Sequence, residues 1–212
     1  MILYYGADCI VEHPEYNSPK SNPSNDYGVG FYLTDDKEMA KLWAGRYETG
    51  YLITYDINMK GLKKLFLDDA GEESVLKWIS VLVNHRFSKS ERDRYAPVIS
   101  WLNENYSFDV EDIDLIIGYR ADDAYFDYSR DFVSNDLSLE ALSSAMKLGE
   151  LGKQYVLISQ KAFKSIKMIR YEKVQRSDEY SIIRKINKER YLTLKKGDNI
   201  NNTFIRDIMR KK

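Results

Sequence analysis

Hydrophobic and polar positions along the chain follow two different periods. Short apolar or alternating runs predict strands in the segments ILYYGA, GFYLT, GYLITYDIN, DIDLIIGY, KQYVLIS and IKMIRYEKV. Apolar residues three to four positions apart predict helices beginning near Lys37, over 72–86, near Pro97, within RADDAYFDYSRDF and in SLEALSSAMKLG. Because strands and helices mix without a regular βαβ repeat, the pattern favours an α+β fold.

Turn and cap residues mark where these elements begin and end. Residues 7–27 contain three of the four prolines together with Asn and Ser, which predicts a long surface loop. Asp35 or Asp36 can cap the helix that follows GFYLT. Ser138 is the expected N-cap of SLEALSSAMKLG, and Gly149 is its expected C-terminal stop.

The charge of the chain is distributed unevenly. The 212 residues carry a net charge of -1, and with 43% hydrophobic residues they can form one good-sized core. Residues 170–212 contain 13 Lys and Arg against 6 Asp and Glu, a net of +7. We therefore expect a domain at 1–169 and a basic C-terminal extension at 170–212. Such an extension binds phosphates or an acidic partner, or is a solvated, partly helical segment.

Residues that would indicate export or a membrane location are not found in the sequence. The start MILYYGAD has no basic region, and no run reaches the roughly 18–20 apolar residues of a membrane span. Cys9 is the single cysteine, so a disulfide framework is excluded and a reducing cytoplasm is expected. Without a reactive signature around it, this thiol is expected to be buried.

Several common types of enzyme site are also excluded. His13 and His85 have no companion ligand at metal-binding spacing, so no metal is expected. A Ser-His-Asp triad is not indicated because no G-x-S-x-G motif occurs. The segment GVGFYL lacks the third glycine of a dinucleotide fingerprint and leads into a strand instead of a helix.

Four segments carry a resemblance to a known superfamily: LYYGAD, GVGFYLT, IIGYRADDAYF and SLEALSSAMKLGELGKQYVL. In this order they resemble the ADP-ribosyltransferase superfamily, which includes poly-ADP-ribose polymerases and diphtheria-like toxins. The chain is most similar to an uncharacterised family of bacterial proteins of this type, over about residues 2–168. The resemblance implies an α+β fold in which two small, mainly antiparallel sheets, flanked by helices, form an NAD cleft.

The resemblance also implies roles for individual residues in NAD binding. Tyr5 and Gly6 stand at the superfamily's His-Gly pair, where the glycine presents its backbone to the nicotinamide carboxamide. Tyr32 matches the tyrosine that packs against nicotinamide. Trp43 follows it by 11 positions, as does the aromatic residue that stacks on the other face.

Two positions depart from the superfamily pattern, and they bear on catalysis. Tyr5 replaces the usual His, and Gln154 replaces the late Glu, so it can hydrogen-bond the ribose without supplying a negative charge. Because C–N cleavage builds positive charge on the ribose, a nearby carboxylate is expected. Arg120 can pair with the diphosphate, and Asp122 or Asp123 can supply the charge or act as base toward the acceptor.

The function implied by the resemblance is that of a bacterial NAD-dependent mono-ADP-ribosyltransferase in the cytoplasm. NAD is the co-substrate, the acceptor is a nucleic acid or a protein, and an antitoxin is a potential partner. The implied role is a toxin, in a toxin–antitoxin pair or in phage defence. Tyr5 and Gln154 motivate an alternative, a non-catalytic domain that binds NAD or ADP-ribose. A third alternative is an NAD glycohydrolase with water as the acceptor.

Overall fold

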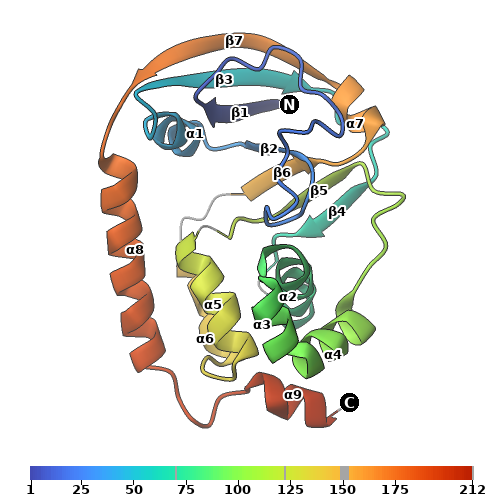
Figure 1. The fold of residues 1–212 in the computed structure, drawn as a ribbon, viewed down its shortest axis with the longest axis vertical. Coiled ribbons are helices and arrows are strands. Elements are labelled where there is room, and N and C mark those ends of the chain that lie inside the picture. Colours follow the sequence, from blue (N-terminus) through green and yellow to red (C-terminus); the bar gives the residue numbers. More distant parts are fainter. Residues whose placement is uncertain (70, 122, 149–152, 212) are drawn as a thin grey trace.

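The computed structural model describes residues 1–69, 71–121, 123–148 and 153–211. These residues form an α+β fold, as the sequence predicts, with one seven-stranded sheet and nine helices in the described ranges (Figure 1). The strands are β1 (Ile2–Ala7), β2 (Phe31–Thr34), β3 (Thr49–Ile57), β4 (Lys64–Leu67), β5 (Leu115–Tyr119), β6 (Lys153–Leu157) and β7 (Ile166–Gln175). The helices are α1 (Lys37–Ala44), α2 (Glu72–Arg86), α3 (Lys89–Arg94), α4 (Ala96–Tyr106), α5 (Asp123–Val133), α6 (Leu139–Leu148), α7 (Gln160–Lys164), α8 (Glu179–Lys196) and α9 (Ile205–Lys211).

The sheet consists of two halves that join at a single residue pair. The strand order is β4-β5-β6-β2-β1-β3-β7, with β4 and β5 parallel and the other pairs antiparallel. Strand β1 pairs with β3 along its whole length, but with β2 only at Tyr4↔Thr34. Beyond Tyr4, β1 and β2 therefore diverge. The expectation of two separate small sheets was wrong, because this one pair keeps the sheet continuous.

Each face of the sheet covers its own hydrophobic core, because successive side chains of a strand point to opposite faces. The larger core lies under α2, α4, α5 and α6 and includes Trp78, Phe132 and Val156. The smaller core contains Leu3, Tyr55 and other strand residues, and it is covered in part by α7. The cores on the two faces of the sheet thus differ in size, and the layer formed by α2 to α6 lies on one side of the sheet (Figure 1).

Helix α1 packs directly on the backbone of β1. Its N-cap is Asp36, whose side chain accepts a hydrogen bond from Met39 N at 3.0 Å, which decides between the two predicted caps. A Cβ on Gly6 would lie 2.0 Å from the backbone oxygen of Ala40. Glycine is therefore required at this position for the helix to approach the strand, independently of any ligand.

Most predicted elements occur in the structure, and the described residues contain a further short strand and further helices. The N-cap prediction for Ser138 is confirmed, because its Oγ accepts a hydrogen bond from Ala141 N at 3.1 Å, whereas the predicted stop Gly149 lies outside the described residues. The apolar pattern did not predict β4, α3 or α7, and α8 and α9 were expected only as part of a partly helical extension. Helix α3 has a capping box between Ser88 and Glu91, but it buries no residue, so no apolar pattern marks it.

The C-terminal segment packs into the same body as the rest of the chain. The predicted boundary at 169/170 falls within β7, and α8 then runs down the side of α1 and α5 to α9, beneath the helical layer (Figure 1). Tyr191, Ile205 and Ile208 are buried in the larger core. The proposed division into a domain and an extension stays a prediction, but this part of the chain contributes to the core.

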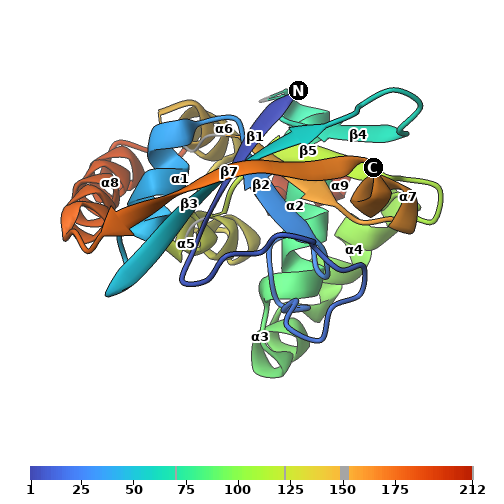
Figure 2. The ribbon, with the colours of Figure 1, turned by 90° about the horizontal axis from the view of Figure 1, so that it is seen from above.

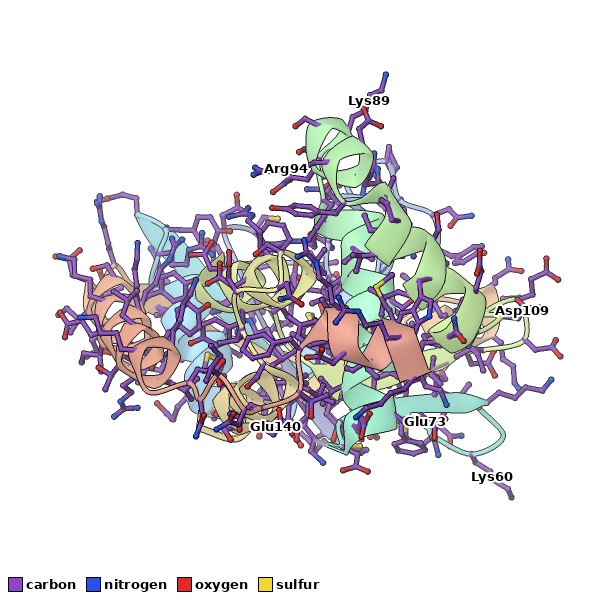
Figure 3. All side chains as sticks on the ribbon, turned by 90° about the horizontal axis from the view of Figure 1, so that it is seen from below. Lys60, Glu73, Lys89, Arg94, Asp109 and Glu140 are labelled. Atoms are coloured by element: carbon purple, nitrogen blue, oxygen red, sulfur yellow. The ribbon has the colours of Figure 1, made fainter. Side chains whose placement is uncertain are left out.

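The loop between β1 and β2 lies on the side of the sheet near α2 and α3 (Figure 2). Seen from below, charged side chains at the ends and turns of the elements point outward (Figure 3). Those labelled are Lys60, Glu73, Lys89, Arg94, Asp109 and Glu140. Among the helices that the structure describes, none combines the length and apolar character needed to cross a membrane.

Candidate functional site

A cavity of about 810 Å³ opens where β1 and β2 diverge. The loop between these strands borders it on one side, and α1, the end of β5, the start of β6 and the first turn of α8 contribute the remaining walls. Six residues predicted from the sequence line it: Tyr5, Gly6, Tyr32, Trp43, Arg120 and Gln154. Residues far apart in the sequence are thus brought together at the weak junction of the sheet.

Tyr5 and Gly6 lie on opposite faces of β1. The ring of Tyr5 packs against Phe31 with a centroid distance of 4.8 Å, at the edge of the smaller core. Burial raises the pKa of its hydroxyl to about 12, so the phenol stays protonated. Gly6 faces α1 on the other side. The side chain of Tyr5 and the Cα hydrogens of Gly6 thus point to opposite faces of β1, while both residues line the cavity.

Tyr32 closes the turn that precedes β2. Its hydroxyl donates to Gly28 O at 2.6 Å and accepts from Tyr27 N at 3.1 Å, and burial raises its pKa well above the ordinary value. Gly28 adopts a φ of 75°, and a Cβ there would lie 2.7 Å from the ring of His85. The hydroxyl of Tyr32 thus fixes a turn that only glycine fits, while its ring lines the cavity.

Trp43 and Arg120 form a stacked pair inside the cavity. The guanidinium carbon of Arg120 lies 3.4 Å from the centroid of the indole, a close cation–π contact. Arg120 is only 7% exposed. The guanidinium covers one face of the indole, so the proposed stacking of nicotinamide on Trp43 would use the other face. Trp43 Nε1 is buried and has no hydrogen-bond partner among the described residues.

Gln154 lies on β6, inside the sheet, and lines the same cavity as this pair. It is 8% exposed and is paired across the strands with Thr34 of β2 and Gly118 of β5. Its Oε1 atom is buried and makes no hydrogen bond to any residue that the structure describes. Buried side-chain polar atoms usually have a partner. Gln154 Oε1 and Trp43 Nε1 are therefore available to a polar ligand in the cavity.

A clamp holds the peptide groups on both sides of Arg120. The Tyr27 hydroxyl donates to Tyr119 O at 2.5 Å, and Trp78 Nε1 donates to the same oxygen at 3.1 Å. On the other side, Ala121 N donates to Asp26 Oδ2 at 2.9 Å. Because both neighbours are fixed to buried side chains, the direction of the Arg120 side chain is restricted before any ligand binds.

Asp26 is a site residue that the sequence analysis missed. It is 5% exposed, lines the cavity and forms an ion pair with Arg86 at 3.2 Å. Its neighbours Asn25 and Gly28 are typical turn residues, so the segment indicated only a turn. The partner Ala121 is 95 positions away in the chain, and such a contact leaves no periodic signal in the sequence.

The side chains of the two acids predicted from the RADDAY segment are not among those that the structure describes. Asp122 lies outside the described residues. Asp123 is the first residue of α5, but its side chain is not among those described. Within the described part of the site, Asp26 is a buried carboxylate on the cavity wall.

The position of Cys9, in the loop that borders the cavity, differs from the expectation. Cys9 is exposed and lines the cavity, although a buried thiol was expected, because the loop carrying it runs over the surface. Its pKa is raised, mainly by desolvation and by a hydrogen bond with Asp8, so the thiol is protonated at neutral pH. In the described ranges, no group of three or more His, Cys, Asp or Glu is arranged to hold a metal ion.

Two residues at the rim of the cavity were also missed. Arg46 follows the end of α1, and its guanidinium carbon lies 5.5 Å from the Trp43 centroid and 4.7 Å from that of Tyr180. The rings of Trp43 and Tyr180 meet edge to face at 6.4 Å. Tyr180 belongs to α8, which the sequence analysis treated only as a basic extension.

Comparison with known proteins assigns the chain to a family of unknown function. No curated protein and no solved structure matches the chain. A family model described as "Protein of unknown function (DUF3990)" matches residues 1–168, which include every cavity residue named above except Tyr180. The chain therefore belongs to the DUF3990 family.

Proposed function

We propose that the protein is an NAD-dependent mono-ADP-ribosyltransferase that transfers ADP-ribose from NAD to a macromolecule. One observation supports this above all: the residues to which the resemblance gives NAD-binding roles line a single cavity. They come from β1, β2, α1, the end of β5 and β6. Residues without a shared function would not be expected to line one cavity together.

The chemistry of the cavity fits a dinucleotide. Its volume of about 810 Å³ falls within the roughly 300–1,000 Å³ typical of small-molecule sites. Arg120 is fixed by the clamp and carries the charge that a diphosphate requires. Tyr32 and Trp43 offer aromatic surface, and the buried Nε1 of Trp43 and Oε1 of Gln154 offer one donor and one acceptor. Together these groups suit the charged, aromatic and polar parts of NAD.

In the proposed reaction the bond between ribose C1′ and the nicotinamide nitrogen breaks, and nicotinamide leaves with the electron pair. An oxygen or nitrogen of the acceptor then bonds to C1′ and releases its proton to a base. Gln154 accepts a hydrogen bond from the ribose. Asp26 is a buried carboxylate that lines the same cavity, and its negative charge would favour the positive transition state. Asp122 and Asp123 remain proposed candidates for the base.

A second candidate function is binding of NAD or ADP-ribose without turnover. Two observations favour it: a neutral Gln154 stands where the superfamily has an acid, and the Asp26 carboxylate is already paired with Arg86. Each of these two features weakens the stabilisation of the positive charge that develops on the ribose during C–N cleavage. The two functions differ in whether NAD is consumed, which is directly measurable.

The test is incubation of the purified protein with NAD labelled in the adenylate, together with cellular RNA, DNA or protein. Label transferred to one polymer supports the transferase and identifies the acceptor class. Release of nicotinamide without transfer indicates a glycohydrolase. If NAD is bound but stays intact, the non-catalytic alternative holds. Gln154→Ala should abolish turnover, whereas Gln175→Ala, at the exposed end of β7, should not.

We also propose the biological role that the resemblance implies, a toxin or phage-defence effector of bacterial cytoplasm. Inducible expression in a bacterial host tests this role. Wild-type protein should arrest growth, and Gln154→Ala at the same expression level should not. Equal growth with both proteins, in a host whose NAD and polymers remain unmodified, would contradict the toxin role.

A further inference from the structure

The rim of the cavity carries a guanidinium stacked against two aromatic rings. Arg46 lies 4.7 Å from the Tyr180 centroid and 5.5 Å from that of Trp43. Arg46 is exposed and Tyr180 is half-buried, and both line the cavity mouth together with Trp43. Flat aromatic and guanidinium groups are the surfaces on which unpaired nucleobases stack in nucleic-acid-binding proteins.

A basic helix leads away from this stack. Helix α8 contains six Lys and Arg against two Glu, and it begins beside the end of α1 (Figure 1). Arg184 and Lys188 follow Tyr180 at i+4 and i+8, so the three share one face of the helix. Both are exposed. A strand whose base stacks at Tyr180 would therefore find positive charge along its phosphate backbone.

The α8 part of this rim lies outside the region that the family model matches. That match ends at residue 168, whereas Tyr180, Arg184 and Lys188 belong to α8. Trp43 and Arg46 lie within the matched region, as does Arg120 of the inner wall. Helix α8 therefore completes a rim that the family region begins, and a rim of this kind is suited to bind the second substrate of a transfer reaction.

We propose that Trp43, Arg46 and Tyr180 form a subsite for an unpaired nucleobase, and that the acceptor is a single-stranded nucleic acid. Its assignment as the acceptor site rests on the proposed transferase function, whereas the binding itself does not. Transfer then joins a nitrogen or oxygen of the nucleotide to C1′ of the ribose, with nicotinamide as the leaving group and the acceptor proton passing to a base. An acidic protein would pair with α8 but would not require the stack of rings.

Fluorescence anisotropy with labelled single-stranded RNA and DNA of the same sequence tests the binding. Stacking on one aromatic side chain contributes about 1–3 kcal/mol per base, so Tyr180→Ala should weaken binding by roughly fivefold or more. Tyr180→Phe should retain the affinity, because the ring remains. Arg46→Ala should weaken binding more than Arg170→Ala, which removes an equal charge from β7. Tyr171→Ala, at an exposed tyrosine of β7, is the matched aromatic control.

The outcomes separate this inference from the proposed function. Tighter binding of RNA than of DNA would show that the protein also recognises the 2′-hydroxyl. Equal binding of RNA and DNA would show that the protein recognises the base without the 2′-hydroxyl. Either result supports the subsite. Equal affinities for Tyr180→Ala and Tyr171→Ala would overturn it, as would equal binding of single strands and duplexes. If label from NAD reaches only protein, the acceptor inference fails although the transferase stands. Tyr180-dependent binding without NAD consumption leaves the nucleobase subsite standing and refutes the transferase.

Discussion

Arg120 and Arg46 both lie against the ring of Trp43, one inside the cavity and one at its rim. Arg120 is buried 3.4 Å from the ring centroid, and its neighbours Tyr119 and Ala121 are fixed by hydrogen bonds. Arg46 is exposed, 5.5 Å from the same centroid, in a turn after α1. An arginine whose neighbouring peptide groups are fixed by hydrogen bonds is preorganised for one ligand, whereas an exposed arginine can adjust to several ligands.

Both arginines lie within residues 1–168, but the rim also depends on a segment beyond this range. The inner groups come from residues 1–168, which belong to the family, and they are bound to the larger core through Trp78. The rim depends on Tyr180 of α8. We therefore expect changes at the inner groups to affect folding and NAD binding together. Changes at the rim should affect the acceptor with little loss of stability.

The largest expected effect is that of Trp78→Ala. Trp78 is fully buried in the larger core, and its Nε1 donates to Tyr119 O beside Arg120. Removing such a side chain should lower the free energy of unfolding by about 3–5 kcal/mol. Urea denaturation measures this loss. Trp101→Ala, at a half-buried tryptophan next to Tyr106, is the control and should lose less. Equal losses would argue against a special role of Trp78.

The next effect is that of Asp26→Asn, which breaks the ion pair with Arg86 and weakens the hold on Ala121. The free energy of unfolding should fall by about 1.5–3 kcal/mol, because hydrogen bonds to charged groups are strong. If Asp26 positions Arg120, KM for NAD should rise more than kcat falls. Asp56→Asn, which removes an exposed ion pair with the N-terminus, should cost no more than about 1 kcal/mol. A fall in kcat alone would instead indicate that the Asp26 carboxylate stabilises the positive transition state.

Tyr32→Phe should have a smaller effect and separates the ring from the hydroxyl. Loss of the bonds to Gly28 O and Tyr27 N should lower the free energy of unfolding by about 1–2 kcal/mol. NAD affinity, measured by calorimetry, should remain if the ring forms the wall of the site. Tyr32→Ala should lose that affinity. If both variants bind NAD like the wild type, Tyr32 only fixes the turn.

The smallest effect concerns the attachment of the C-terminal segment. Burial disfavours the ionised form of Asp198, but hydrogen bonds from Ser138 and Asn202 outweigh it and hold its pKa below the ordinary value. The carboxylate therefore stabilises the fold above the pKa of the unfolded state, and this contribution is lost as pH falls through the folded pKa. Urea midpoints measured from neutral into acid pH should show the loss. Asp198→Asn should flatten that part of the profile, and Asp178→Asn, a cap without a side-chain bond, should not.

The sequence predicted the parts of the fold that have a periodic apolar pattern. Helix α2 and strands β1 and β3 are rich in buried apolar residues, and they occur where the pattern placed them. Strand β4 was missed because its four residues, KLFL, bury only Leu67 fully. The single junction at Tyr4↔Thr34 depends on where two strands diverge, which no local pattern encodes.

The sequence predicted only those site residues that lie within the segments carrying the resemblance, or at a fixed spacing from them. These segments and this spacing indicated Gly6, Tyr32, Trp43, Arg120 and Gln154, which line one cavity. The stacking of Arg120 on Trp43 and the clamp through Asp26 were not foreseen, since each joins residues more than 70 positions apart. That Tyr5 and Gly6 point to opposite faces of β1 follows from the alternation of side chains along a strand, so this feature could be predicted from the sequence.

Calorimetric titration of NAD into wild-type protein, Trp43→Ala and Tyr171→Ala tests the central claim that this cavity binds NAD. We predict that wild type and Tyr171→Ala bind NAD with the same affinity. Trp43→Ala removes the ring on which Arg120 rests, and its binding should weaken by roughly tenfold or more, equivalent to about 1.4 kcal/mol. Equal binding by all three proteins, or no binding to the folded wild type, would contradict the account.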